Sequence, residues 1–263
     1  MTAPRIPAYN LFFGDRPDRP ADAREIGWIG TNGPAIDRAL WPRGPLTGLP
    51  MLHAFTIELP EEYRRRGPDY PAIAFFQGEG QFAEEDEESR PDAESGDPFL
   101  RQWAEAREHP MLERREDVID GQFAFIWLTA EEFRGGPTPP PEDVRREGEH
   151  GDDDEGPNAW DTPVEHETAW LADREDPNAG LAPNESGADG YELRFESDPF
   201  AVKPWADALW KFDHLGGTAF PVQALPEGLS PYYLEFGEFG GLNFGGGAAQ
   251  LDLETDVFDW ACG

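Results

Sequence analysis

The sequence has very little sulfur. Its single cysteine, Cys262, excludes an internal disulfide, so the chain does not require an oxidising compartment. We interpret Cys262 as a small buried side chain rather than a nucleophile. None of the five histidines shows the H-x-x-x-H spacing of a zinc site, and a Cys-x-x-Cys pair is absent. His150 precedes an acidic run, Asp152 to Asp154, but this run lacks the D-x-D-x-D-G spacing of a calcium loop. The sequence predicts no metal and no cofactor.

Long hydrophobic runs are also missing. The longest, at 123–128, is far too short to cross a bilayer. The first residues lack the apolar segment of a signal peptide. We therefore expect a soluble cytoplasmic protein with no membrane association.

Basic residues are few, and only Lys203 and Lys211 are lysines. The chain has 21 basic and 54 acidic residues, which gives a formal net charge of -33. Such a surface repels nucleic acid and anionic membranes, and it attracts a basic protein partner. The same composition also serves solvation in a salt-rich cytoplasm or follows from a GC-rich genome, and both interpretations stay open.

Motifs for catalysis are absent. Serine is scarce and no G-x-S-x-G sequence occurs. The glycines at 240–247 follow apolar residues, but no helix start with Lys or Ser/Thr comes after them, which excludes a P-loop and predicts tight turns. Paired carboxylates carry no information in so acidic a chain. We predict no catalytic residue.

The chain nevertheless has the composition of a folded core. It is 38% hydrophobic and 13% aromatic, which indicates a globular protein with charged loops rather than a disordered chain. Period-two alternation and short apolar runs predict strands at 52–59 (with a phase slip near Phe55), 72–76, 122–128, 191–195, 232–236 and 241–244.

Capping signals and helical spacing predict short helices. These cover 60–67, 99–109 after the cap Asp97, the capping box at 129–132, a start at 162–165 with Trp170 on its apolar side, and 204–212. The last of these would place Trp205 and Trp210 in the core.

Polar segments separate these elements. Residues 1–25 are interpreted as an irregular arm, and 27–50 as turns over a sheet edge. Residues 84–97 form an acidic loop, and 135–190 a Pro-rich and acidic insertion, within one domain over 1–263.

The two ends of the chain share a pattern. A Gly-Pro block, a strand and a second strand before a Gly-rich turn occur at 27–82 and again at 214–251. Internal duplication and chance similarity of turn residues both explain it. A duplication would place a ligand cleft between two similar halves.

Several of these blocks also resemble a known family. They are Trp41-Pro42, the strands at 54–59 and 72–76, the H-x-x-G-G-x-x-x-P-x-Q pattern from His214 to Gln223, the strand at 232–236, the glycines at 240–246, and the closing F-x-W-x-C at 258–262. Together they resemble the YwqG-like (DUF1963) family, and the resemblance covers most of the chain outside the acidic segments.

The resemblance implies an α+β fold with mainly antiparallel sheets in two similar halves. It also implies a cytoplasmic protein without established catalytic activity, and an immunity-like binding role. Two positions depart from the family pattern, because Thr56 and Glu235 stand where Gln is expected. A family site that used those amides would be altered.

The candidate binding residues fall into two groups. Asp213 and His214, with Gln223 and Trp260, would line the cleft of a small-molecule or peptide binder or a hydrolase; the alternative for His214 is a helix-end interaction with carbonyls. The other group is Trp160 and Trp170, which lie in polar sequence and would anchor a basic protein partner if exposed. Our principal hypothesis is a non-enzymatic binding protein that docks a basic partner through an acidic face.

Overall fold

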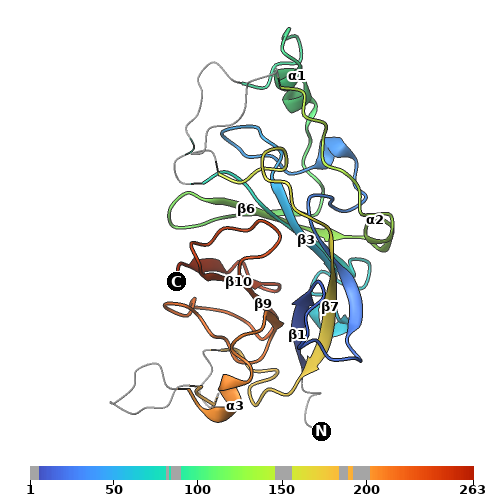
Figure 1. Cartoon of the computed structure of the whole chain (residues 1–263). Coiled ribbons are helices and arrows are strands. Elements are labelled where there is room, and N and C mark those ends of the chain that lie inside the picture. The colour runs from blue at the N-terminus through green and yellow to red at the C-terminus, as the bar shows by residue number, and fades with distance from the viewer. Residues whose placement is uncertain (1–5, 81–82, 84–89, 146–155, 184–188, 192–201) are drawn as a thin grey trace. The chain divides into compact units, whose positions relative to one another are not determined.

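The chain forms two compact units. The computed structural model describes residues 6–80, 83, 90–145, 156–183, 189–191 and 202–263 (Figure 1). The terminal unit comprises Met1–Glu25, Ala169–Glu238 and Phe244–Gly263, and the central unit comprises Ile26–Thr168 and Phe239–Asn243. The chain passes from the terminal to the central unit within β2 (Arg24–Ile29) and returns within β7 (Glu167–Arg174).

The central unit is built on an antiparallel sheet. Its strands lie in the order β2-β3-β4-β6-β5, where β3 is Leu52–Glu58, β4 is Ala72–Gln77, β5 is Leu112–Glu116 and β6 is Gln122–Leu128. Four short helices accompany it in the described residues: η1 (Arg38–Leu40), η2 (Glu61–Tyr63), α1 (Pro98–Glu105) and α2 (Ala130–Arg134).

The core of the central unit lies on both faces of β4 and β6. Both strands are nearly continuous apolar runs, as expected when neither face meets water. The Phe55 and Phe75 rings stack on one face with centroids 5.4 Å apart. On the other face, Trp41 packs edge-on against Phe76.

The terminal unit is also built on antiparallel strands. Its strands lie in the order β11-β10-β9-β8-β1-β7, and β1 (Ala8–Phe13) and β7 lie side by side in Figure 1. The others are β8 (His214–Leu215), β9 (Tyr233–Phe236), β10 (Ala248–Asp252) and β11 (Phe258–Ala261), and a one-turn helix, α3 (Pro204–Asp207), precedes β8.

The two faces of these strands differ in chemistry. Leu215, Leu234, Leu251 and Phe258 are register partners across β8 to β11, so they share one face. The three leucines are at most 1% exposed, which makes this the apolar face. The opposite face is polar and also buried, and it provides the candidate site.

Most of the predicted strands and caps are confirmed. The strands at 52–59, 72–76, 122–128 and 232–236 correspond to β3, β4, β6 and β9. The phase slip near Phe55 is a register shift between His53 and Phe55. Asp97 caps α1, and Thr129 with Glu132 forms the predicted capping box of α2. The glycines at 240, 241, 245 and 246 adopt positive φ, as tight turns require. Antiparallel sheet therefore dominates, as predicted, whereas the helices are few and short.

Several local predictions are wrong. Residues 241–244 form a turn, and the strand lies later, at β10. The helix predicted from 162 is coil followed by β7, because alternation of buried Ala169 and Leu171 prevails over the capping signal. The supposed irregular arm contains β1. The predicted helices at 60–67, 99–109 and 204–212 shrink to η2, α1 and α3.

Two side chains predicted to be buried are exposed. Trp210 is 57% exposed because α3 ends before it. Cys262 is also exposed, since it follows the edge strand β11. The strand predicted at 191–195 lies outside the described residues except for Tyr191, as do residues 84–89 of the acidic loop and the run around His150. No helix in the described part of the chain is long and apolar enough to cross a membrane.

The packing of β4 gives a test of the fold. Phe75 is fully buried, so Phe75→Ala should lower the free energy of unfolding by about 3–5 kcal/mol through lost burial and a residual cavity. Urea denaturation measures the change. Val118→Ala is the control, because Val118 is 93% exposed and its truncation should change stability by less than about 0.5 kcal/mol. Equal effects of the two substitutions would contradict the placement of β4 at the core.

Candidate functional site

A row of polar residues crosses the terminal sheet. Asn10, His214, Glu235, Gln250 and Asp259 are successive register partners on β1, β8, β9, β10 and β11. Directly paired residues of an antiparallel sheet project from the same face. The three central members are at most 6% exposed. The sheet therefore buries a continuous polar row on the face opposite its leucines.

Glu235 is the centre of this row. Gln250 Nε2 donates to Glu235 Oε2 at 3.1 Å, and the Phe220 amide donates to both carboxylate oxygens at 3.0 Å. His214 Nδ1 lies 4.0 Å from Glu235 Oε1. The carboxylate thus attaches the loop that follows β8 to the middle of the sheet.

His214 is held between two oxygens. Its Nδ1 lies 3.1 Å from the Phe212 carbonyl oxygen, and its Nε2 lies 3.2 Å from the Tyr233 hydroxyl. Burial, together with the nearby Arg174 charge, lowers the pKa of His214 well below its usual value. The Tyr233 hydroxyl donates its single proton to the Gly217 carbonyl at 3.1 Å, so that proton is not given to Nε2. A neutral ring therefore donates in only one of its two contacts, either from Nδ1 to the Phe212 carbonyl or from Nε2 to the hydroxyl oxygen.

Two carboxyl groups in this region titrate close to neutral pH. Burial raises the pKa of Glu235 to about 7, and hydrogen bonds from Phe220 and Gln250 oppose that rise. Burial likewise raises the pKa of Asp213 to about 6, although the Gly237 amide donates to its Oδ1 at 2.8 Å. The row therefore contains a carboxyl group, that of Glu235, with a pKa near neutral pH.

A buried ion pair adjoins the row. The side chains of Arg174 and Asp176 are fully buried, and Arg174 Nε donates to Asp176 Oδ2 at 3.0 Å. Arg174 Nη1 also donates to Asn10 Oδ1 at 2.9 Å, which links the pair to the end of the row. Asp176 accepts from both the amide and the hydroxyl of Thr218. This pair therefore fixes β1, β7 and the loop after β8 to one another.

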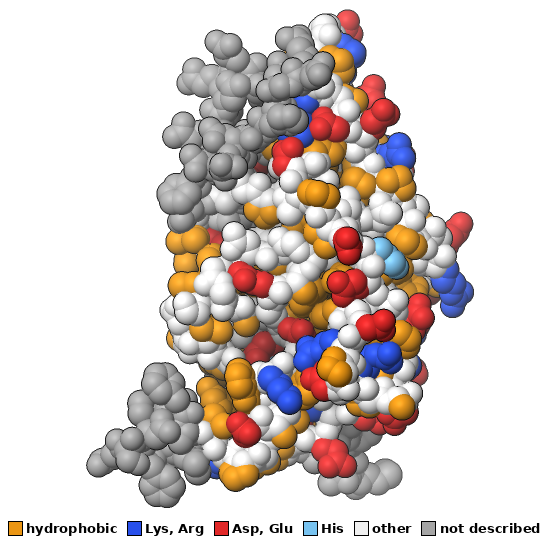
Figure 2. All heavy atoms as spheres, in the orientation of Figure 1, with side chains coloured by type: hydrophobic (Ala, Val, Ile, Leu, Met, Phe, Trp, Pro, Cys, Tyr) orange, Lys and Arg blue, Asp and Glu red, His pale blue; other side chains and the backbone are white. Residues whose placement is uncertain are grey.

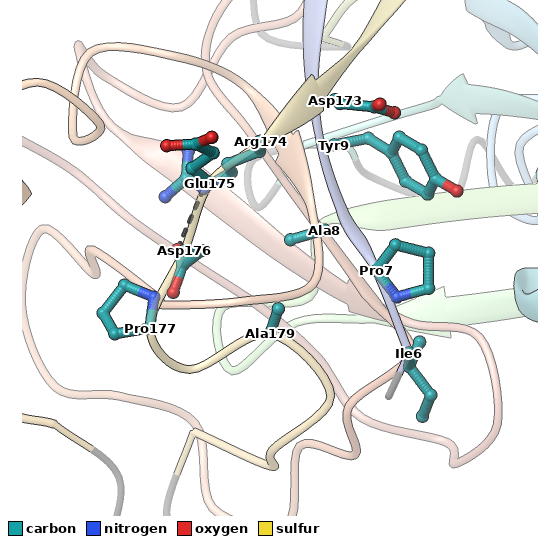
Figure 3. A pocket seen from close by; sticks show the side chains of 10 residues that line it. All are labelled: Ile6, Pro7, Ala8, Tyr9, Asp173, Arg174, Glu175, Asp176, Pro177 and Ala179. Carbon is teal, nitrogen blue, oxygen red and sulfur yellow. Dashed lines mark hydrogen bonds and ion pairs between the residues drawn. The ribbon is translucent and has the colours of Figure 1, made fainter. Parts of the chain in front are cut away.

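A hollow of about 720 Å³ lies beside this ion pair (Figure 3). Arg174 and Asp176 line it, flanked by Asp173 and Glu175, which are exposed. Tyr9 forms part of the wall and is the register partner of Asp173. The remaining lining residues are apolar: Ile6, Pro7, Ala8, Pro177 and Ala179.

The predicted cleft residues are only partly brought together. His214 is a member of the polar row, and Asp213 precedes it in the chain. Gln223 is exposed and donates to the Cys262 carbonyl at 3.0 Å. Trp260 belongs to β11, where it neighbours Asp259 and so projects from the opposite face, and its ring lies 5.8 Å from that of Phe244.

The predicted partner anchors are covered by arginines. Trp160 is partly buried, with the Arg145 and Arg43 guanidiniums 4.8 and 5.9 Å from its ring. Its indole donates to the Pro141 carbonyl. Trp170 is also partly buried, and the Arg19 guanidinium lies 4.0 Å from its ring.

Sequence reasoning missed four members of the site: Asn10, Arg174, Asp176 and Gln250. The sequence DREDPNAGLAPNESGADG at 173–190 is interpreted as loop within the predicted 135–190 insertion, which hides Arg174 at the end of β7. Alternation in Ala169 and Leu171 was the available signal for that strand. Within the ranges that the structure covers, no group of three or more His, Cys, Asp or Glu side chains could hold a metal ion.

Glu235 gives a pH-dependent prediction. An acid with a raised folded-state pKa binds its proton more tightly when folded, so its contribution to stability falls as pH rises from about 4.5 to about 7. The Glu235→Gln variant lacks this loss. Its free energy of unfolding relative to the original chain should therefore rise over that interval, by on the order of 3 kcal/mol.

Urea denaturation at pH 5, 6, 7 and 8 measures this difference. Glu254→Gln is the control, because Glu254 is exposed on the loop after β10. A difference for Glu235→Gln that stays constant with pH would show that Glu235 is ionised in the folded protein throughout the range.

In comparisons with known proteins, no family model, no curated protein and no solved structure matches the chain. The likeness to the YwqG-like family stays a prediction, and the function must be argued from the site itself.

Proposed function

We propose that the protein binds a basic protein partner and that the hollow beside Tyr9 receives one of its Lys or Arg side chains. One observation carries this proposal. Asp173 and Glu175 are exposed at the hollow, and neither has a cationic partner in the described part of the chain. The only cation of the lining, Arg174, is already neutralised by Asp176.

The rest of the described surface supports an anionic field. Many of the chain's arginines form ion pairs with its own acids, as in Arg16–Asp18, Arg66–Glu113 and Arg145–Asp161. These pairs leave the large acidic excess uncompensated. Figure 2 shows Asp and Glu side chains spread over the visible face. Such a field speeds the encounter with a basic partner.

The chemistry of the hollow favours a guanidinium or an ammonium group. Two carboxylates can accept charge-assisted hydrogen bonds from either. The Tyr9 ring adds a surface over which a cation is attracted. Pro7 and Ala8 supply apolar contact for the methylene stem of the incoming side chain.

A duplicated architecture belongs to the same proposal. The strands β2-β3-β4-β6 of the central unit and β8-β9-β10-β11 of the terminal unit each lie in that neighbouring order. Thr56 and Glu235, the two departures from the family pattern, lie on the second strand of each series. We therefore favour internal duplication within a YwqG-like α+β protein of the cytoplasm, with an immunity-like role in which the basic partner is the bound species.

Binding of nona-arginine tests the hollow. The double variant Asp173→Asn, Glu175→Gln should weaken binding about tenfold, because two charge-assisted contacts are lost. Fluorescence anisotropy with a labelled peptide measures the dissociation constant, and raising the ionic strength should weaken binding to the original protein.

The matched control is Glu61→Gln, Glu62→Gln. It removes the same charge from exposed positions on η2 and should change binding by no more than about twofold. If both double variants weaken binding equally, the acidic field acts without a preferred site. If nona-arginine binds with no dependence on salt, the docking proposal is wrong.

A further inference from the structure

The central unit contains a groove of opposite character. Its volume is about 410 Å³, within the range of small-molecule sites. We call it the arginine groove, because three arginines line it in a chain that has so few basic residues. Its lining consists of Trp41, Pro42, Arg43, Gly44, Pro45, Pro91, Trp103, Ala104, Ala106, Arg107, Glu108, Leu112 and Arg114.

Arg43 is the unusual member of the groove. It is only 6% exposed, yet its hydrogen-bond partners are neutral: Nη1 donates to the Gly48 carbonyl at 2.6 Å, and Nη2 donates to Gln102 Oε1. Burial lowers the pKa of Arg43 to about 10. No carboxylate forms an ion pair with Arg43 among the residues that the structure describes.

A buried cation without a counter-ion is unfavourable. Desolvating a guanidinium is costly, and proteins normally offset that cost with an anion. Arg174 shows the usual solution in this chain, since it is 5% exposed and bonded to Asp176. Arg43 has similar burial but no anion beside it in the described part of the chain, which points to a ligand that supplies one.

The acid that contacts the turn beside Arg43 is Glu79, and its carboxylate is already engaged. Glu79 is buried, and its carboxylate accepts from the amides of Leu46 and Thr47 and from the Thr47 hydroxyl. These contacts hold the turn from Gly44 to Gly48, whose last carbonyl accepts from Arg43. Glu79 therefore shapes the groove without pairing with Arg43.

The rim of the groove adds two accessible cations. The Arg107 side chain is 63% exposed and pairs with Asp37, whose side chain is 57% exposed. Arg114 donates through Nε to Glu108, which is 72% exposed, and through Nη1 to the Arg43 carbonyl. Ion pairs as exposed as these contribute little, so an incoming anion can replace Asp37 or Glu108 at small cost.

Apart from three arginines and Glu108, the lining of the groove is apolar or glycine. Trp103 packs directly on Gly48, where an added Cβ would come within 2.3 Å of the indole, so the turn and the ring fix each other. Trp41 is 2% exposed and donates to the Met51 carbonyl, which fixes its ring as well. Rigid aromatic walls suit the face of a planar ligand.

From this arrangement we infer that the arginine groove binds a small organic carboxylate with a planar apolar body. The carboxylate would accept hydrogen bonds from Arg107 and Arg114 and compensate the charge of Arg43, while the apolar body packs between Trp103 and Leu112. This site is independent of the hollow in the terminal unit, because it has the opposite charge and lies in the other unit.

Calorimetric titration with 1-naphthoate tests the inference. Two probes of the same shape, naphthalene-1-methanol and 1-naphthylmethylamine, separate charge from apolar contact. We expect 1-naphthoate to bind at least about tenfold more tightly than the alcohol, and the amine to bind least, because charge-assisted hydrogen bonds provide the difference.

Variants locate the bound carboxylate. Arg107→Gln and Arg114→Gln should each weaken 1-naphthoate binding about tenfold and leave binding of the alcohol unchanged. Both side chains are partly exposed at the rim, so we expect these variants to keep the fold, and their unfolding curves check this. Arg134→Gln is the matched control, since Arg134 is exposed at the end of α2 and does not line the groove. Arg43→Gln should remove the preference for the anion, with its unfolding curve recorded alongside.

Three results would overturn the inference: no binding of 1-naphthoate up to its solubility, equal affinity for all three probes, or equal losses in Arg134→Gln and the rim variants. None of these results depends on binding of nona-arginine by the terminal unit, so the two proposals can fail separately.

Discussion

The terminal unit depends on the buried ion pair between Arg174 and Asp176, whose two charges are removed from water together. Each ion alone would cost several kcal/mol to bury, and the pair is tolerable only because further hydrogen bonds satisfy the remaining polar atoms. The Arg174 guanidinium also donates hydrogen bonds to the Asn10 side chain and the Leu209 carbonyl, and the Asp176 carboxylate accepts two from Thr218. These partners come from segments far apart in the chain. The requirement to satisfy one ion pair therefore specifies how β1, β7 and the loop after β8 assemble.

The polar row extends the same constraint across the sheet. Hydrophobic residues can be buried on a sheet face without directional contacts. The buried Glu235 carboxylate, in contrast, needs hydrogen-bond donors at defined positions. It finds them at Phe220 and Gln250. Burial raises the pKa of Glu235 to about 7. The carboxyl group that holds these strands in register therefore changes its charge near neutral pH. Polar satisfaction, rather than apolar area alone, fixes the register of β8 to β10.

How far the sequence predicts this molecule varies from place to place. Local signals were reliable for strands buried on both faces, such as β4 and β6, and for the caps at Asp97 and Thr129, because their causes lie within a few residues. The prediction for the segment that forms β7 failed, because a helix-capping signal at 162–165 competes there with strand-like alternation. For the site, Asp213, His214 and Glu235 drew attention in the sequence. Arg174 did not, since its partner Asn10 lies 164 positions away and no local pattern encodes that contact.

Arg43 and Arg174, the two buried arginines among the described residues, lead to opposite conclusions about function. Arg174 is compensated internally, so the field at its hollow is determined by the exposed Asp173 and Glu175, and a cation is the ligand that this field favours. Arg43 has no anionic partner among the described residues, so its buried charge favours an anionic ligand although the chain as a whole is strongly negative. Net charge describes the encounter of the protein with a distant partner. The choice of ligand at contact depends instead on which buried charges remain uncompensated, and in this molecule that differs between the two units.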